Sequence, residues 1–181
     1  MHIKRRVLAA LVTITAAISI GAWSVAQAAQ QPLTTAKATA DDQPSVVEDY
    51  TYPDAAGVLA TYKVTVISGD GHILVVDCAT PPEGNFGLLV VRSNESAGAG
   101  GTGKVCFKIT STSGFLNLKL PGVYELKGDG RTTGTGHKVK ADLTTDNGQR
   151  TIVDVDPSGS TQVGTGTGTA PTTLLRLDVA P

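Results

Sequence analysis

Short apolar runs, separated by Gly, Pro, Asn or Asp, dominate the chain from Val46 onward. The runs are rich in Val, Ile, Thr and Tyr, which favour strands, whereas the separating residues favour turns. No window after the first 28 residues has the 3.6-residue periodicity of an amphipathic helix. The pattern predicts an all-β fold, an antiparallel β-sandwich that is Ig-like or jelly-roll-like. Its strands are expected at residues 46–52, 59–67, 72–78, 86–92, 104–111, 115–120, 122–127, 137–145, 149–156 and 172–179.

A turn at Gly69-Asp70-Gly71 predicts a first hairpin with a three-residue loop. This register would place Lys63 opposite Asp77 on one face and apolar residues opposite each other on the other face. His72 would start the second strand of this hairpin, opposite Ser68. The expected apolar pairs are Val66 with Leu74, Val64 with Val76, and Tyr62 with Cys78.

Asp146-Asn147-Gly148 predicts a second hairpin, for which two loop lengths are possible. A two-residue Asn-Gly turn would place Lys140 opposite Val155 and so mix charged and apolar faces. A three-residue loop with Gly148 in the left-handed conformation keeps the faces separate, and because a one-residue slip inverts every side chain, it is the favoured register. The expected pairs are Leu143 with Thr151, Ala141 with Val153, Val139 with Val155, Lys140 with Asp154, and Lys138 with Asp156.

The first 28 residues have the pattern of a secretory signal peptide. Lys4, Arg5 and Arg6 precede a charge-free apolar run, and Ala26-Gln27-Ala28 provides small residues for cleavage after Ala28. An uncleaved anchor is the alternative, because 7–29 carries no charge and could span a bilayer, but its Thr, Ser and Gln residues argue against this. The paired arginines leave twin-arginine export open beside the general secretory route. The sequence therefore predicts a secreted, extracellular protein without a stable membrane anchor after cleavage.

Removal of the signal peptide changes the composition of the remaining chain. The only Trp and the only Met are lost, and the formal charge moves from −1 to −4 because three cations and no acids leave. This acidity argues against nucleic acid as a partner, since a phosphate-binding surface needs clustered Lys and Arg. Residues 29–45 are polar and predict a flexible leader, and 46–181 is expected to be a single β-sandwich domain. With few aromatic residues, its core should be mainly aliphatic.

Cys78 and Cys106 are the only cysteines, and in an exported chain they predict one disulfide. Alternation along 104–109 places Val105, Phe107 and Ile109 on one face and Cys106 on the other, whereas Cys78 shares a face with apolar residues. Either one strand is bulged, or the bridge lies near a sheet edge. A catalytic thiol or a metal site is less favoured, because no His lies nearby to complete a zinc ligand set.

Residues suited to catalysis occur in turns and at strand ends. His72 follows Asp70 in one turn, which suggests acid–base chemistry, but a turn followed by the start of a strand explains the same residues. The segment 127–131 is interpreted in the same way, and His137 as a solvated edge residue. The common nucleophile-elbow, phosphate-loop and zinc-helix motifs do not occur in the sequence. No catalytic residue, cofactor or metal is therefore predicted.

Three further features are candidate binding residues. Asp154 and Asp156 would lie about 7 Å apart on one strand face, as in a calcium site or a glycosidase pair, although the lysines predicted opposite them are a simpler explanation. Tyr50 and Tyr52 would share a face and could form an aromatic platform for a sugar, or could pack against the sheet. The loop Thr80-Pro81-Pro82-Glu83 beside Cys78 could present a rigid surface to a protease.

The segments FKITSTSGFLNLKLPGVYELKGDG (107–130), IVDVDPSGSTQV (152–163) and TTLLRLDV (172–179) resemble small exported proteins of actinobacteria that have no assigned activity. This resemblance covers the C-terminal half and implies secretion and a compact β-domain. It implies no functional residues. The sequence as a whole favours a non-catalytic binding or surface-associated module with an extracellular protein or glycan as partner. The alternatives are a protease inhibitor or secreted hydrolase, and a binder of cell-wall polysaccharide.

Overall fold

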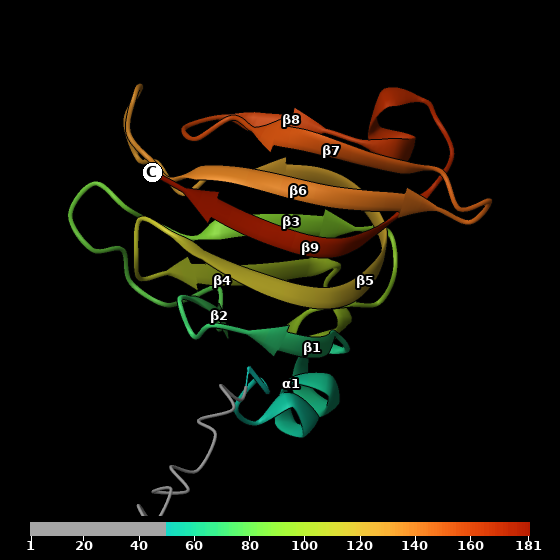
Figure 1. Ribbon diagram of the computed structural model, residues 1–181, viewed down its shortest axis with the longest axis horizontal. Helices are drawn as coiled ribbons and strands as arrows, with labels where there is room; N and C mark the ends of the chain where they lie inside the picture. Colours follow the sequence, from blue (N-terminus) through green and yellow to red (C-terminus); the bar gives the residue numbers. More distant parts are fainter. Residues whose placement is uncertain (1–49) are drawn as a thin grey trace, which may run out of the picture. The chain divides into compact units, whose positions relative to one another are not determined.

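The structure, a computed structural model, describes residues 50–181. The predicted signal peptide (1–28), the polar leader (29–45) and the first residues of the expected strand 46–52 lie outside the described residues. Within the described residues, nine strands pair antiparallel in one hydrogen-bonded sheet (Figure 1). The predicted all-β antiparallel fold with one disulfide is confirmed.

The strands are β1 (Thr65–Gly69), β2 (Ile73–Val76), β3 (Leu89–Ser93), β4 (Lys104–Ile109), β5 (Gly114–Lys127), β6 (Lys138–Thr145), β7 (Arg150–Val155), β8 (Ser160–Gln162) and β9 (Thr172–Ala180). One α-helix, α1 (Ala55–Tyr62), precedes β1. Two short 3-10 helices, η1 (Ala99–Gly101) and η2 (Gly164–Thr167), lie in connections. Strand β8 and helix η2 fall in the stretch 157–171, for which the sequence predicts no strand.

Strand β5 turns the single sheet into a sandwich. Its first half pairs with β1 and β9, and its second half pairs with β3 and β8. The pairing with β9 is irregular around Pro121 and Gly122, where Gly122 has φ +68°. The bend separates a first layer, in the order β1-β5-β9-β6-β7, from a second layer, in the order β2-β4-β3-β5-β8. The strands expected at 115–120 and 122–127 are therefore one curved strand (Figure 1).

The core lies between the two layers and is mainly aliphatic, as expected. Leu116, Leu118 and Leu177 face inward from the first layer, and Leu89 and Val105 from the second, all without solvent exposure. Phe107 and Tyr52 are the aromatic residues of this core among the described residues. Each fully buried Leu or Val stabilises the fold by roughly 1.5–3 kcal/mol relative to an exposed one.

The helix α1 was not predicted from the sequence pattern, and the strand expected there is wrong. The pattern predicts a strand at 59–67, but the helix continues to Tyr62 and β1 starts only at Thr65. Asp54 caps the helix by accepting a hydrogen bond from the Gly57 backbone N at 3.2 Å, and Lys63 ends it with φ +57°. Such a short helix, with only Val58 buried, has too little periodicity to be recognised.

The predicted first hairpin is also wrong. Strand β1 pairs with β5, and β2 pairs with β4, so β1 and β2 belong to different layers. Ser68 pairs with Asn117 rather than lying opposite His72. The turn at 69–71 carries the chain between layers, and Asp70 fixes it by accepting hydrogen bonds from the backbone N atoms of His72 and Phe115, both at 3.1 Å. Turn residues reveal a change of direction but do not specify the pairing partner.

The second hairpin is confirmed in its three-residue register. Val139 pairs with Val155, Ala141 with Val153, and Leu143 with Thr151. Gly148 has φ +84°, and the Lys140 Nζ donates to Asp154 Oδ1 at 2.6 Å. The expected contact of Lys138 with Asp156 is replaced by a bond from Lys138 Nζ to the Pro181 carbonyl at 2.9 Å.

The predicted disulfide between Cys78 and Cys106 is confirmed. The two Cα atoms are 5.2 Å apart. Cys106 lies in β4 opposite Val76 of β2, and Cys78 follows two residues beyond, after β2 has ended. Because β2 is the edge strand of its layer, the bridge lies near a sheet edge, which was one of the two expected solutions.

Candidate functional site

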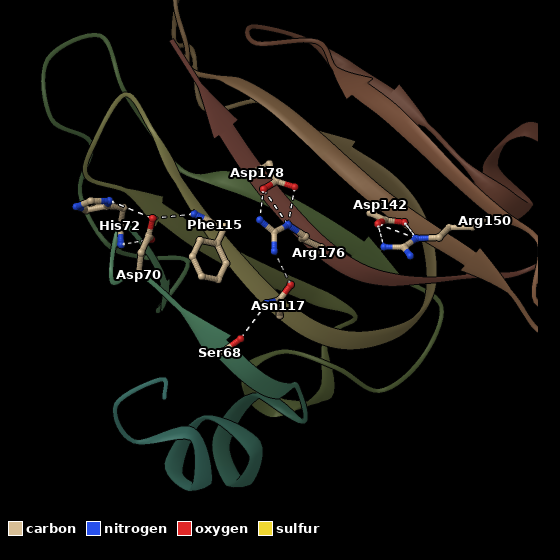
Figure 2. A network of polar contacts seen from close by, with 9 residues as sticks. All are labelled: Ser68, Asp70, His72, Phe115, Asn117, Asp142, Arg150, Arg176 and Asp178. Atoms are coloured by element: carbon tan, nitrogen blue, oxygen red, sulfur yellow. Dashed lines mark hydrogen bonds and ion pairs between the residues drawn. The ribbon is translucent and has the colours of Figure 1, made fainter. Parts of the chain in front are cut away.

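The outer face of the first layer carries an ordered row of side chains that crosses all five strands. Ser68 on β1 pairs with Asn117 on β5, which pairs with Arg176 on β9. Arg176 in turn pairs with Asp142 on β6, and Asp142 with Ile152 on β7. At about 4.8 Å between strands, this central row is about 19 Å long. Figure 2 shows its polar members on one face of the sheet.

A second row runs parallel to the central row. Phe115 on β5 pairs with Asp178 on β9, which pairs with Lys140 on β6, and Lys140 with Asp154 on β7. Side chains two residues apart on a strand share a face, so the two rows are neighbours. The two rows and the positions beside them carry charges of both signs: Lys119, Lys140, Arg150, Arg176, Asp142, Asp154 and Asp178.

Arg176 joins the two rows. Its Nε donates to both carboxylate oxygens of Asp178 at 2.8 Å, and its second terminal nitrogen donates to Asp178 Oδ1 at 2.6 Å. The first terminal nitrogen donates to Asn117 Oδ1 at 3.1 Å, and Asn117 Nδ2 donates to Ser68 Oγ at 2.9 Å. The hydrogen bonds to Asp178 raise the pKa of Arg176 above its ordinary value, so the guanidinium stays charged.

Two aromatic rings, those of Phe115 and Tyr50, lie beside Arg176. The guanidinium carbon of Arg176 is 4.6 Å from the centroid of the Phe115 ring, and the Tyr50 ring is 5.5 Å from Phe115 at an angle of 57°. Tyr50 is 43% exposed. Tyr52 does not join it, because Tyr52 is buried in the core and its hydroxyl accepts a hydrogen bond from the Val75 backbone N at 2.9 Å. The structure therefore brings Phe115 to Tyr50 in place of Tyr52.

Asp142 is a buried carboxylate on this face. Its side chain is 7% exposed, and Arg150 covers it with two hydrogen bonds from Nε, at 2.7 and 2.9 Å, and a further one from a terminal nitrogen. These hydrogen bonds raise the pKa of Arg150. Arg150 therefore occupies both carboxylate oxygens of Asp142.

The remaining predicted site residues have separate partners. His72 is exposed at the turn before β2, and its Nδ1 is 3.4 Å from Asp70. Asp154 is 80% exposed and binds Lys140. Asp156 lies beyond the end of β7, where its Oδ1 accepts a hydrogen bond from the Ser158 backbone N at 3.1 Å. These three residues do not converge on one reacting position.

The prediction that His137 is a solvated edge residue is wrong. Its side chain is 11% exposed, and its Nδ1 is 2.6 Å from Asp129 Oδ2. Asp129, predicted as a turn residue, is itself almost completely buried, with 1% of its side chain exposed. The ring of Phe86 packs on His137 with 4.5 Å between centroids. The sequence contains no signal for this pair, because the fold of residues 128–137 brings the two side chains together.

The described residues contain no group of three or more His, Cys, Asp or Glu placed to hold a metal ion. In that same part of the chain, no helix has the length and apolar character needed to cross a membrane. Alternation along β5 and β9 could identify Asn117 and Arg176 as outward-facing. Their alignment in one row could not be foreseen, because it depends on which strands pair.

No protein-family model matches this chain, and none of the curated proteins compared with it is significantly similar.

Proposed function

We propose that this chain is an exported, non-catalytic binding module whose outer first-layer face binds an extracellular polysaccharide. The observation that carries the proposal is the ordered central row, in which Ser68, Asn117 and Arg176 hold each other in fixed conformations. Side chains that are already immobilised lose little conformational entropy when a ligand binds. Exposed ion pairs add little to stability, so the order of this row is better explained by recognition than by folding.

The composition of the face favours a glycan over a protein. The centre of a protein–protein interface is depleted of charged residues, whereas Arg176 and Asp178 occupy the centre here. Most charges on the face are paired with an opposite charge, as in Lys140 with Asp154 and Arg176 with Asp178, which disfavours a highly charged polymer as the ligand. Amide, carboxylate and guanidinium groups can form hydrogen bonds with pairs of sugar hydroxyls, and the exposed Tyr50 ring offers an apolar surface. The central row, about 19 Å long, fits a short stretch of a linear chain.

The export predicted from the N-terminal sequence favours an extracellular ligand. The disulfide between Cys78 and Cys106 belongs to a type of bond that persists in oxidising compartments. We expect the protein recovered from culture medium to begin at Ala29, and N-terminal sequencing measures this. Recovery of the full-length chain with the membrane fraction would instead favour an uncleaved anchor.

Co-sedimentation with insoluble glycans (cellulose, chitin and cell-wall peptidoglycan) tests the binding proposal. Tyr50→Ala should reduce the retained fraction several-fold on the glycan that binds. Phe86→Ala is a matched control, because Phe86 is 42% exposed but lies in the connection between β2 and β3. Asn117→Ala should also weaken retention, and thermal unfolding checks that each variant is folded. If no glycan retains the protein, or if both aromatic variants behave alike, the proposal fails.

A second candidate function, inhibition of an extracellular protease, is favoured by the loop 77–86. Pro81, Pro82 and Glu83 are exposed. Cys78 anchors the loop to β4 through the disulfide, and Glu83 forms an ion pair with Lys108. A proline-containing loop held at both ends loses little entropy on entering an active site.

Stoichiometric inhibition assays with subtilisin-like and trypsin-like enzymes test this second function. The intact protein should inhibit at a one-to-one ratio, and the variant C78S/C106S should be cleaved in the loop instead. Rapid cleavage of the disulfide-bonded protein, or its complete lack of effect on both classes of protease, would remove this candidate. Neither result bears on glycan binding, because the loop lies outside the first-layer face.

A further inference from the structure

We infer that a pocket beside the disulfide binds a small ligand that carries an oxyanion, either a phosphate or a carboxylate. The pocket has a volume of about 450 Å³, within the usual range for small-molecule sites. It lies over the outer face of the second layer, under the loop that joins β2 to β3. This site is separate from the first-layer face and does not depend on glycan binding there.

The floor of the pocket is apolar and comes from paired strands. Val90 of β3 stands between Cys106 of β4 and Lys127 of β5 in the sheet register. The disulfide-bonded Cys78 and Leu88 add to this floor. The rest of the lining comes from two segments, which we call its walls: Thr80 and Pro82 in the loop between β2 and β3, and residues 127–131 with Ser158. A ligand of this site therefore has an apolar or neutral body that can contact Val90 and Leu88.

Three cations line this pocket: Lys104, Lys127 and Arg131. Five other described cations are matched with carboxylates, namely Arg92 with Glu125, Lys108 with Glu83, Lys140 with Asp154, Arg150 with Asp142 and Arg176 with Asp178. Lys63 and Lys138 donate to backbone carbonyls instead, and Lys119 lies by itself on the other layer, so the pocket is where three unmatched cations gather. None of the three pocket cations has a described carboxylate within ion-pair distance. Their positive charge is therefore available to a ligand, although the described chain as a whole is slightly acidic.

Asp129 also lines the pocket but does not cancel this charge. Its two oxygens are already occupied by His137, whose backbone N donates at 2.8 Å and whose Nδ1 is 2.6 Å away. Because 1% of the Asp129 side chain is exposed, a ligand has little access to it. The accessible charges at the rim are those of the two lysines and Arg131.

The two walls are tied together before any ligand binds. Arg131 donates from a terminal nitrogen to the Gly84 carbonyl at 3.0 Å and from its backbone N to the Asn85 carbonyl at 3.1 Å. The Gly87 backbone N donates to the Asp129 carbonyl at 2.6 Å. These bonds hold the loop in place, so the pocket is preformed. A ligand therefore does not have to order the loop when it binds, which lowers the entropy cost of binding. Phosphate and carboxylate are the groups that such a Lys and Arg set binds.

Titrations with sodium phosphate and with sodium acetate, followed by amide chemical shifts at constant ionic strength, test the inference and separate the two oxyanions. We expect saturable shifts at Leu88, Gly128 and Gly130 with at least one of them, and none with chloride. Lys127→Gln should weaken the apparent affinity about fivefold. Lys119→Gln is the matched control, because Lys119 is an exposed strand lysine of the other layer without an ion-pair partner among the described residues.

Three outcomes would overturn the inference: shifts that stay linear with concentration for both anions, shifts scattered over the surface, or equal effects of the two lysine variants. The last outcome would mean that only the overall charge of the protein matters. The spectrum of each variant also reports its folding, and Lys104→Gln provides an independent second test of the same site. Failure here would leave the glycan experiment unaffected, because Tyr50 and Asn117 lie on the other layer.

Discussion

The carboxylate of Asp129 accepts the backbone N–H of His137 at 2.8 Å through one oxygen and lies 2.6 Å from its imidazole Nδ1 through the other. The two side chains are 1% and 11% exposed, so this contact is formed away from solvent. The neighbouring Gly128 packs closely on the backbone of Asp156 and Pro157, and Gly130 on that of Thr135 and Pro157, which leaves no room for a Cβ atom at either position. The Asp129–His137 pair therefore fixes the loop 128–137, whose first residues line the pocket beside the disulfide.

Removing this carboxylate should be costly. We expect Asp129→Ala to lower the free energy of unfolding by about 2–3 kcal/mol, because the buried backbone N–H and the imidazole lose their partner. Asp129→Asn should cost less, since an amide oxygen can still accept the backbone N–H. Urea unfolding measures both values. Asp154→Ala is the control, because that carboxylate is exposed and should have little effect. Similar losses for Asp129→Ala and Asp154→Ala would contradict this view of the pair.

The disulfide should make a large contribution to stability. The bridge closes a loop with a sequence separation of 28, for which chain entropy predicts about 3–4 kcal/mol. We expect the variant C78S/C106S to lose that amount in urea unfolding relative to the oxidised protein. Wild-type protein under reducing conditions should match the variant. A loss below about 1 kcal/mol would show that the unfolded chain is already restricted in this region.

Gly148 should be the most sensitive residue of the β6–β7 turn. It has φ +84°, and no atom lies within 4 Å of the place that a Cβ would occupy, so backbone strain alone opposes a side chain there. We expect Gly148→Ala to destabilise the domain by about 1–2 kcal/mol. Gly148→Asn should cost less, because Asn tolerates the left-handed region better. Thermal unfolding gives the comparison, and an equal loss for Ala and Asn would argue against backbone strain as the cause.

Tyr52 should make stability fall in alkaline solution. Burial raises the pKa of Tyr52 above its ordinary value of 10.0, although the hydrogen bond from Val75 opposes this shift. Because the folded pKa is above the unfolded one, the stabilisation is complete below pH 10 and is lost as the pH rises through the folded pKa. We expect the free energy of unfolding to fall more steeply for the wild type than for Tyr52→Phe as the pH rises above the ordinary tyrosine value of 10.0. Parallel curves for the two proteins would contradict this assignment.

Local patterns predict much of this fold correctly. The second hairpin could be predicted to the residue, because its charged face, its apolar face and the glycine of its turn all agree on one register. The disulfide was predicted from two cysteines in a chain whose N-terminal pattern predicts export. The aliphatic core followed from the composition. In each case, the prediction needs only a short segment of the sequence or the amino-acid composition of the chain.

The candidate sites depend on contacts between distant segments. The row from Ser68 to Ile152 exists only because β1 pairs with β5 instead of β2, and because β9 inserts between β5 and β6. The turn residues at 69–71 are compatible with either pairing, so no local feature chooses between them. The Asp129–His137 pair and the cluster of three pocket cations likewise depend on how loops and strands pack together, which no local sequence pattern predicts.

An antiparallel β-rich chain, one hairpin register and the cysteine pair could be read from the amino-acid sequence, because turn chemistry, alternation and composition are local properties. The tertiary structure alone decided the bend of β5 at Pro121-Gly122, the capped helix before β1 and the meeting of Arg176 with Phe115 and Asn117. Those features depend on which apolar faces bury each other, and burial is a property of the whole chain.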